Sequence, residues 1–560
     1  MPATTTFSRT GNAYIDGLLG ETKWATTSLS YSFPTSAAFY GSGYGAGETT
    51  KGFAALNAAQ QAAAKAAFSA MAAVSNLKFT AIAETASRHA DLRLAASDLP
   101  STAWTYMPSI VAEGGDAWFN RSAGYYDRPV KGNYAFATFM HEIGHGLGLE
   151  HPQDGNVMPA DRDSMEYTIM SYRSYSGASA TRGYTNETWG FAQSLMMYDI
   201  AALQHLYGAN YATNSGSTVY KWSPTTGEMF INGAGQGAPG ANRIFLTVWD
   251  GGGVDTYDFS NYSTALKVDL RPGAWTTTAS TQLAKLHYNG SQVAKGNIAN
   301  ALLHDGDPRS LIENAKGGSG NDVITGNDAA NVLWGNAGKD ILIGGNGNDN
   351  LIGGAGADRL DGGSGSDLAN YSGATAAVVA DLLTPGANKG EAAGDTYVSI
   401  ERLYGSKFND SLRGDNLVNT LYGAAGHDVL YGRGGNDTLQ GGDGNDTLEG
   451  NAGADSLYGQ AGADLFRFRS TADSTTGARD TIRDFASGID DIDLRSIDAN
   501  TRVAGDQAFS YIGAKAFSGS AGQLHFVGGV LSGDVNGDKA ADFAINVLGA
   551  STLYQSDFLL

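Results

Sequence analysis

The feature that most restricts the fold of this 560-residue chain is a nine-residue repeat in its C-terminal half. Six consecutive copies cover residues 317–370, beginning with GGSGNDVIT, and a second array with the same period covers residues 405–468. Each copy follows the pattern G-G-x-G-x-D-x-U-x, in which U is a large aliphatic residue. A unit this short can pack only against its neighbours, so the sequence predicts two arrays of stacked parallel strands.

The repeat also predicts a cation site at each regular turn. Its glycines allow a tight turn that exposes carbonyl oxygens, the aspartate adds a carboxylate, and the aliphatic residue points into the core. Residues 317–470 contain 20 acidic and 9 basic residues, so charge repulsion should make a bound cation necessary for folding. Oxygen ligands in a flexible loop suit Ca²⁺ better than Mg²⁺. The predicted calcium ligands in the arrays are Gly317, Asp322, Gly335, Asp340, Gly344, Asp349, Gly353, Asp358, Asp367, Asp428, Asp437, Asp446, Asp455 and Asp464.

Two copies depart from the pattern. Asn331 and Asn419 replace the aspartate, so we expect their turns to bind calcium weakly or not at all. A glycine-rich flexible linker is an alternative interpretation of the whole region. The regular aspartates, followed two residues later by Val, Ile or Leu, argue against a linker.

Composition excludes several kinds of partner and site. The formal net charge of −21 argues against a nucleic acid partner, because phosphate binding needs clustered Lys and Arg. The chain has no cysteine, so any metal must be held by histidine, carboxylate or carbonyl groups. No apolar run reaches the roughly 18 residues that a membrane span needs, and residues 1–20 lack the pattern of a Sec-type signal peptide.

Residues 1–210 have the composition of a mixed α/β domain. The alanine-rich residues 54–74 are predicted to form a long helix, and residues 29–34 and 90–95 are predicted to form strands. Residues 211–316 are β-rich and irregular by comparison.

The strongest local signal in the chain is the segment TFMHEIGHGLGLEHP. Helical residues four apart share a face, so His141 and His145 can direct two imidazoles at one ion. Gly148 tolerates a left-handed conformation that turns the chain and brings His151 back as a third ligand. Three neutral imidazoles leave a position of Zn²⁺ open for water, and Glu142 is placed to take the proton of that water. Incidental histidines on an amphipathic helix are the alternative, and they would not require this spacing.

A second segment, YTIMSY, agrees with a zinc site. Met170 is predicted to form a hydrophobic turn beneath the zinc ligands. The phenol of Tyr172 could approach the metal and stabilise an oxyanion, although an ordinary buried tyrosine is the alternative.

The motif from His141 to His151, the segments TIMSY and SLMMYDIAALQHLYGAN, and the nonapeptide arrays together resemble the serralysin-type metalloproteases, secreted bacterial metzincins with RTX repeats. The resemblance covers nearly the whole chain. It implies broad-specificity cleavage of extended polypeptides, with Tyr172 joining the three histidines around zinc in the resting enzyme. Arg173 departs from the family pattern, in which Trp is frequent at that position, and the second array lengthens the C-terminal region.

The same resemblance implies further sites and partners. The segment GDAWFN, with Ala117 and Trp118, is expected to supply an edge strand that pairs with substrate backbone, and an ordinary strand is the alternative. Residues 557–560 resemble the uncleaved C-terminal signal of a type I exporter, which implies an extracellular, monomeric protein. The exporter and a small periplasmic protein inhibitor are the implied partners besides polypeptide substrates. A further calcium site joining the two domains is expected at Asp250, Gly252, Gly253, Asp255 and Glu313.

The predicted fold is an α+β metzincin catalytic domain followed by parallel β-roll (RTX) calcium-binding repeats and a β-rich C-terminal domain. The expected segments are a catalytic domain (1–210), a β-rich connector with a calcium site (211–316), the first array (317–370), an inserted β cap (371–404), the second array (405–468) and a C-terminal β domain with the secretion signal (469–560).

Two other functional classes are weighed against this interpretation. A non-catalytic adhesin or surface-layer protein with a vestigial zinc site should have lost a histidine ligand or Glu142, and none is lost. A lipase with the same repeats would need a G-x-S-x-G nucleophile segment, which the chain lacks. The turn GDVNGDKAADF at residues 533–543 resembles a calcium loop as much as an ordinary polar turn.

Overall fold

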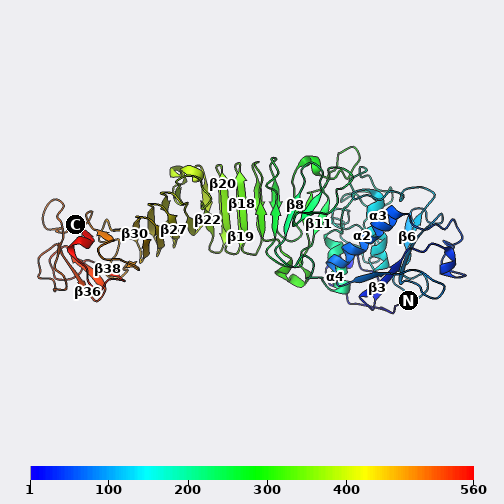
Figure 1. Ribbon diagram of the computed structural model, residues 1–560, viewed down its shortest axis with the longest axis horizontal. Coiled ribbons are helices and arrows are strands. Elements are labelled where there is room, and N and C mark those ends of the chain that lie inside the picture. The colour runs from blue at the N-terminus through cyan, green and yellow to red at the C-terminus, as the bar shows by residue number, and fades with distance from the viewer. Residues whose placement is uncertain (1) are drawn as a thin grey trace. The chain divides into compact units, whose positions relative to one another are not determined.

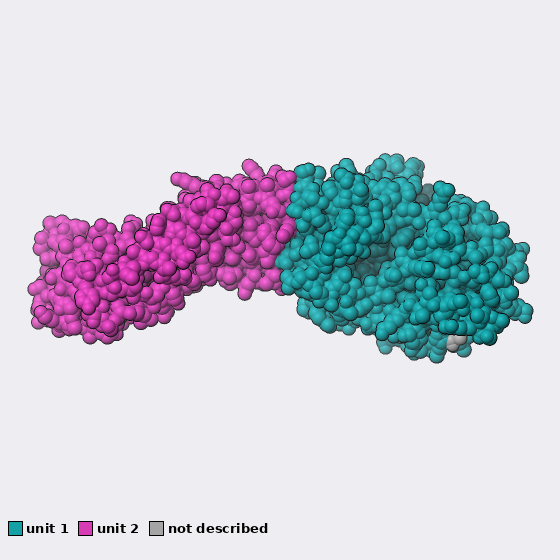
Figure 2. All heavy atoms as spheres, viewed as in Figure 1, with its two compact units in different colours: residues 1–315 teal, residues 316–560 magenta. Residues whose placement is uncertain are grey.

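A computed structural model describes residues 2–560, which fold as two compact units (Figure 2). The N-terminal unit extends to Ala315, and the C-terminal unit comprises Lys316–Leu560. All α-helices of the described residues lie in the N-terminal unit, and none of them has the length and apolar character required to cross a membrane.

The N-terminal unit begins with a five-stranded sheet in the order β4-β3-β5-β7-β6. The first four strands are parallel, and β6 runs antiparallel to β7 at the edge of the sheet. All six residues of β5 are buried, so this central strand forms part of the core. The strand bounds are Ser28–Ser32 for β3, Lys78–Ala81 for β4, Leu92–Ser97 for β5, Ala103–Thr105 for β6 and Ala117–Asn120 for β7.

Three of the helices build the rest of the domain core. Helix α2 (Ala58–Val74) begins four residues later than the predicted helix, because Asn57 adopts an extended conformation and caps it by accepting a hydrogen bond from Gln60 N at 2.9 Å. Its buried face packs on α3 (Tyr134–Gly146) and α4 (Met197–Tyr207). The shorter α1 (Ala13–Asp16) contacts α4.

The remainder of the N-terminal unit is β-rich, as expected for residues 211–316. A parallel pair, β8 (Val219–Trp222) and β12 (Thr256–Asp258), buries Trp222 and Tyr257. The other strands are β9 (Met229–Ile231), β10 (Ala234–Gly235), β11 (Leu246–Val248), β13 (Lys267–Asp269), β14 (Trp275–Thr276) and β15 (Ile298–Asn300).

The C-terminal unit stacks its nine-residue repeats as short parallel strands (Figure 1). Paired strands are offset by 18 residues, so that Leu333 pairs with Leu351 and Leu342 with Leu360. Consecutive repeats therefore alternate between two sheets, and the aliphatic residue of each repeat faces the space between the sheets. These four leucines are fully buried, and each stabilises the stack by about 1.5–3 kcal/mol.

Three sheets make up the arrays. In the first array, one sheet contains β17 (Val323–Thr325), β19 (Ile341–Asn346), β21 (Arg359–Ser364) and β24 (Thr396–Val398). A sheet that runs through both arrays contains β18 (Val332–Ala337), β20 (Asn350–Ala355), β22 (Leu368–Asn370), β25 (Arg402–Tyr404), β27 (Thr420–Ala425), β29 (Thr438–Asp443) and β31 (Ser456–Ala461). The third sheet contains β23 (Val379–Asp381), β26 (Ser411–Arg413), β28 (Val429–Gly434), β30 (Thr447–Ala452), β32 (Leu465–Arg467), β34 (Asp491–Asp493) and β39 (Phe558–Leu559).

The C-terminal residues extend the stack. An antiparallel meander of β36 (Gln523–Val527), β37 (Val530–Asp534) and β38 (Phe543–Val547) follows the second array. The chain then returns as β39, which pairs with β34. Asp557 is buried and accepts hydrogen bonds from Ser487 Oγ at 2.8 Å and Gly488 N at 2.9 Å.

Candidate functional site

Three histidines converge at the C-terminal end of α3. His141 and His145 lie one turn apart on this almost completely buried helix, which ends at Gly146. The chain then turns at Gly148, whose φ of +100° belongs to the left-handed region that favours glycine. A Cβ at this position would lie 2.8 Å from Thr22 O, so space as well as conformation requires glycine. The turn returns His151 to the other two rings.

The three Nε2 atoms form a small triangle. They are separated by 3.2 Å (His141 to His151), 3.1 Å (His141 to His145) and 2.9 Å (His145 to His151). Zinc–nitrogen bonds of about 2.0–2.1 Å in tetrahedral geometry require a separation of about 3.3 Å, so the histidines fit a zinc ion closely.

Hydrogen bonds hold each ring by its other nitrogen. Nδ1 of His141 lies 2.8 Å from Ile169 O, and Nδ1 of His145 lies 2.8 Å from Leu149 O. Nδ1 of His151 lies 2.9 Å from a carboxylate oxygen of Asp154. Because each Nδ1 donates its proton outward, the three Nε2 lone pairs face one another and need a cation between them. Burial, followed by the neighbouring His151, lowers the pKa of His141 to about 3, which keeps the ring neutral.

Glu142 and Tyr172 lie beside this triangle. The Glu142 carboxylate is buried, and its Oε2 accepts a hydrogen bond from Thr105 Oγ1 at 2.8 Å. Burial raises the pKa of Glu142 to about 8, and a cation held by the histidines beside it would lower this pKa and leave the carboxylate able to accept a proton. The Tyr172 ring centroid lies 4.4 Å from that of His151, and the side chain is 38% exposed.

Met170 lies next to the helix that carries His141 and His145. It is fully buried, and a Cβ on Gly144 would lie 3.0 Å from its sulfur, so Met170 packs against α3 between the two helical histidines. No pattern in the sequence indicated that Asp199 supports this segment. Its buried carboxylate accepts hydrogen bonds from Thr168 Oγ1 at 2.5 Å, Ile169 N at 2.9 Å and Met196 N at 2.8 Å.

Arg173, which departs from the family pattern, has a clear partner. Its Nε donates to Asp163 Oδ2 at 2.8 Å, and Asp163 also accepts from Ser171 Oγ at 2.5 Å. The arginine therefore fixes the chain next to Tyr172 without contacting a histidine ligand.

The predicted substrate strand at Ala117 and Trp118 is wrong. Strand β7 pairs with β5 on one side and with β6 on the other, so it has no free edge. Both side chains are completely or almost completely buried. Strand β6 is the edge of the sheet, because it follows β5 in the chain but pairs with β7 on the side away from β5. Strand order of this kind depends on contacts between distant segments and cannot be predicted from the local sequence.

A cleft of about 180 Å³ runs between β6 and the histidines. It is lined by Ala103, Trp104, Thr105, Met107, Glu142, His145, Glu150, His151 and Tyr172. A smaller hollow of about 50 Å³ lies behind Glu142 and is lined largely by aromatic and aliphatic side chains, including Tyr134, Tyr184 and Phe191. The residues expected to carry the chemistry therefore line these two hollows, which share Ala103, Glu142 and Tyr172.

In the arrays, the predicted aspartates repeat one arrangement. One carboxylate oxygen accepts the N–H of the residue 18 positions earlier, as in Asp340 N to Asp358 Oδ1 at 2.8 Å and Asp349 N to Asp367 Oδ1 at 2.8 Å. The other oxygen is buried without a hydrogen-bond partner among the described residues. Such an atom is costly to bury unless a cation satisfies it. This arrangement is found at Asp340, Asp349, Asp358, Asp367, Asp428, Asp437, Asp446, Asp455 and Asp464.

Glycine and carboxylate oxygens meet in these turns. A Cβ on Gly344 would lie 2.0 Å from Asp349 Oδ2 and 2.6 Å from Gly362 O. Asp322 is also buried, with Oδ2 accepting from Gly318 N at 2.7 Å. At Asn419, by contrast, the buried amide Nδ2 has no partner among the described residues, and an amide N–H cannot ligate a cation.

The predicted calcium ligands left out two aspartates that continue the series, Asp410 in the first copy of the second array and Asp480 beyond the end of that array. Asp480 accepts from Asp455 N at 2.9 Å. Asp410 accepts from Val378 N at 2.7 Å, and its own N–H donates to Asp428 Oδ1 at 2.7 Å, so both aspartates continue the hydrogen-bond series of the arrays. The Oδ2 atom of Asp480 is buried and has no partner among the described residues. A signal was present, because Asp410 and Asp480 are each followed two residues later by Leu or Ile, although Asp410 keeps only the first glycine of the pattern and Asp480 keeps none.

The expected connector site gathers three acidic residues. Asp250 Oδ1 accepts from Gly252 N at 2.8 Å, and Glu313 Oε2 accepts from Asp255 N at 2.7 Å. Oδ2 of Asp255 is buried without a hydrogen-bond partner among the described residues. Burial, followed by the charge of Asp250, raises the pKa of Asp255 to about 8. These carboxylates fit an oxygen-coordinated cation.

Comparisons with known proteins identify one matching family model and several curated relatives. The family model described as peptidase M10 serralysin C terminal matches residues 209–384 and 398–560. Metalloprotease AprA of Pseudomonas entomophila is 33% identical over 323 residues, which cover 55% of this chain and 60% of that protein. Serralysin A of Dickeya chrysanthemi is 35% identical over 287 residues, covering 49% and 54% respectively.

The chain therefore spans between about half and three-fifths of the length of these curated relatives. The family match covers more than half of the chain, including both arrays and the β-rich segments around them. This protein belongs to the peptidase M10 serralysin C-terminal family.

Proposed function

We propose that this protein is a secreted zinc-dependent endopeptidase that hydrolyses internal peptide bonds of extended polypeptides with broad specificity. The observation that carries this proposal is the triangle of three Nε2 atoms 2.9–3.2 Å apart, with the Glu142 carboxylate beside it in an open cleft. The names of the relatives, metalloprotease and serralysin, support metal-dependent peptide hydrolysis as the reaction.

His141, His145 and His151 would hold the zinc ion, and Tyr172 would join them in the resting enzyme. Bound zinc supplies a Lewis acid that polarises a carbonyl group and makes water acidic enough to act as a nucleophile near neutral pH. Glu142 takes a proton from the attacking water and delivers it to the nitrogen of the leaving amine. Tyr172 donates a hydrogen bond to the oxyanion that develops on the scissile carbonyl.

Substrate backbone would bind along β6. At the two ends of β6, Thr102 O accepts a hydrogen bond from Asn120 N, and Tyr106 N donates one to Asp116 O. These backbone groups are therefore already paired on the β7 side. In an antiparallel pair the intervening residues alternate, so Ala103 and Thr105 direct their N–H and C=O groups away from β7. An extended polypeptide can add to this edge whatever its side chains, which accounts for broad specificity.

Calcium would fill the array turns and the connector site. The unpaired aspartate oxygens support this assignment, and the ion would offset their mutual repulsion. In a calcium-poor cytoplasm the arrays would remain unfolded and compatible with a type I exporter, and they would fold after secretion. A small periplasmic inhibitor would protect the producing cell, and the mature enzyme would act as a monomer.

Metal analysis combined with casein digestion tests this function. We expect one zinc per chain, loss of hydrolysis with o-phenanthroline, and recovery when zinc is restored. The substitution Glu142→Ala should keep the zinc but lower kcat/KM by at least about a thousandfold, because the proton transfer loses its base. Casein hydrolysis near the wild-type rate by zinc-loaded Glu142→Ala would refute the role of Glu142.

A further inference from the structure

The second array carries a polar groove that none of the roles above requires. It measures about 610 Å³, lies on the outer face of β26, β28 and β30, and is here called the arginine groove. It is lined by Arg413, Asn416, Tyr431, Arg433, Glu449, Asn451 and Arg469, together with Gly434 and Ala452. Residues 316–560 contain 32 acidic and 16 basic residues. The groove, lined by three arginines and one glutamate, therefore has the opposite balance of acidic and basic residues to the unit that contains it.

The repeat itself does not demand these residues. Along the third sheet, Arg413 pairs with Asp381 on one neighbouring strand and with Tyr431 on the other, and Tyr431 pairs with Glu449. The corresponding outward positions in the first array are Thr325, Ile343, Asp361 and Val398, which carry one charge among them. A stable stack therefore forms without a row of arginines.

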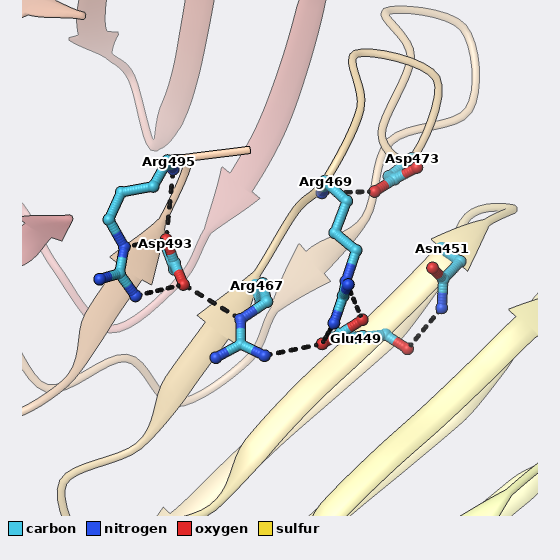
Figure 3. A network of polar contacts seen from close by, with 7 residues as sticks. All are labelled: Glu449, Asn451, Arg467, Arg469, Asp473, Asp493 and Arg495. Atoms are coloured by element: carbon cyan, nitrogen blue, oxygen red, sulfur yellow. Dashed lines mark hydrogen bonds and ion pairs between the residues drawn. The ribbon is translucent and has the colours of Figure 1, made fainter. Parts of the chain in front are cut away.

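Positive charge is in excess around the groove. Buried Asp381 accepts hydrogen bonds from both terminal nitrogens of Arg433, at 2.8 and 2.7 Å, and lies 3.9 Å from Nη1 of Arg413. Buried Glu449 accepts from Arg467 and twice from Arg469, as Figure 3 shows. Four guanidinium groups thus share two carboxylates.

Other charged groups around the groove offset this excess. Asp493 lies between Arg467 and Arg495 and ion-pairs with both (Figure 3). Asp473 accepts the backbone N–H of Arg469 and lowers the local excess by one further charge. Asp491, which lies near Arg495 and Asp493, brings the count to five carboxylates for five guanidinium groups. Attraction of anions to the groove therefore rests on guanidinium donors that have no partner, and not on a net charge.

Several hydrogen-bond donors in the groove are unused. The guanidinium of Arg413 makes no hydrogen bond among the described residues, and its central carbon lies 5.1 Å from the ring centroid of Tyr431. Arg469 is 52% exposed and uses Nε and Nη2 on Glu449, which leaves Nη1 available. Asn416 is exposed and its side chain makes no hydrogen bond among the described residues. The forked donors of arginine match the two oxygens of a carboxylate or sulfate.

We propose that the arginine groove binds an acidic oligosaccharide, one carrying carboxylate or sulfate groups. The guanidinium groups of Arg413 and Arg469 bind its anionic groups, the Tyr431 ring packs against the apolar face of a sugar ring, and Asn416 and Asn451 bind hydroxyl groups. Three strand spacings of roughly 4.8 Å separate β26 from β32, so the row is about 14 Å long, enough for an oligomer of a few units.

Other polyanions fit the groove less well. An extended peptide binds through free backbone groups at a sheet edge, whereas the strands beneath the groove are paired on both sides. A duplex nucleic acid carries one charge per about 1.7 Å and would meet strong repulsion from the surrounding acidic residues. A uronic acid oligomer carries one charge per sugar, so its carboxylates are spaced widely enough to bind separate arginines such as Arg413 and Arg469.

Calorimetric titration of the calcium-loaded full-length protein with tetra- to hexagalacturonate tests the proposal. We expect saturable binding that weakens with salt, and no binding of the neutral maltohexaose. Arg413→Gln and Tyr431→Ala should each weaken binding about tenfold or more. Arg359→Gln is the matched control, because Arg359 is an outward-facing arginine next to Asp361 in the first array, and it should leave binding unchanged.

The thermal melting of each variant in calcium checks that the stack is intact. Absence of saturable binding, or binding that Arg413→Gln leaves unchanged while Arg359→Gln weakens it, would overturn the proposal. Equal binding of polyglutamate would show that charge alone acts. Binding to vesicles of phosphatidylcholine with phosphatidylglycerol is measured as well. Vesicle binding that depends on Arg413, in the absence of oligogalacturonate binding, would overturn the proposal and assign the groove to lipid headgroups. None of these readings depends on proteolytic activity.

Discussion

His151 differs from the other two histidines in what holds its ring. Backbone carbonyls hold His141 and His145, whereas the side chain of Asp154, which is 56% exposed, holds His151. A backbone acceptor cannot be removed by substitution, but a carboxylate can. Among the proposed zinc ligands, His151 is therefore the one whose orientation can be tested without touching a ligand.

Asp154→Asn should lower zinc affinity by about 10–100-fold, because an acceptor that orients a ligand imidazole and raises its basicity is weakened. Competition with a chromogenic zinc chelator measures this affinity. Activity should return at saturating zinc, which separates the effect from a loss of catalytic groups. Asp127→Asn makes the same charge change at an exposed carboxylate of the same unit and should leave zinc affinity unchanged. Unaltered affinity in Asp154→Asn would remove Asp154 from this role.

At the scale of the repeat element, glycine positions are fixed by space inside the turns. Gly344→Ala would place a Cβ 2.0 Å from Asp349 Oδ2, so we expect weaker calcium binding and a loss of about 1–3 kcal/mol in the free energy of unfolding. Gly373→Ala is the control, because nothing lies within 4 Å of a Cβ at that position. Thermal melts at fixed calcium compare the two variants, and equal melting temperatures would contradict the crowded turn.

The calcium-free arrays should respond to pH in an unusual direction. Burial raises the pKa of Asp340, Asp358 and Asp437 from 3.8 to about 7. A carboxyl group whose folded pKa is raised contributes stability that is fully present below its unfolded pKa and is lost as pH rises through its folded pKa. Calcium-free protein should therefore be more stable near about pH 4 than near about pH 8.

Calcium should reverse this trend, because protons then compete with the cation for the same oxygens. Circular dichroism melts of chelator-treated, desalted protein follow the arrays, with calcium-loaded protein as the reference. If the stability of the calcium-free protein rises with pH, the prediction that burial raises the pKa of these carboxyl groups is wrong.

At the scale of the whole molecule, two metals are proposed to act on different parts of the fold. The proposed zinc ligands lie in the N-terminal unit, whereas the array aspartates lie in the C-terminal unit. Removing zinc with o-phenanthroline should abolish hydrolysis and leave the melting transition of the arrays unchanged. Removing calcium should lower that transition strongly, since cation binding and folding are coupled in the arrays. Differential scanning calorimetry measures both, and a shift of the array transition on zinc removal alone would contradict this division.

The nine-residue period and the spacing of His141, His145 and His151 were sufficient to predict stacked parallel strands and three converging histidines. Both follow from local rules, because neighbouring repeats pack on each other and helical residues four apart share a face. Gly148 was likewise predictable, since its left-handed turn depends on its own backbone.

Contacts between distant segments decided the rest. The family resemblance implied a substrate edge at Ala117 and Trp118, but the order of strands put β6 outside β7. Asp480 and Asp410 joined the aspartate series without the glycine pattern, and arginines from separate strands met in one groove. Such pairings depend on which strands become neighbours when the chain collapses, and a single residue's surroundings in the sequence carry no record of that choice.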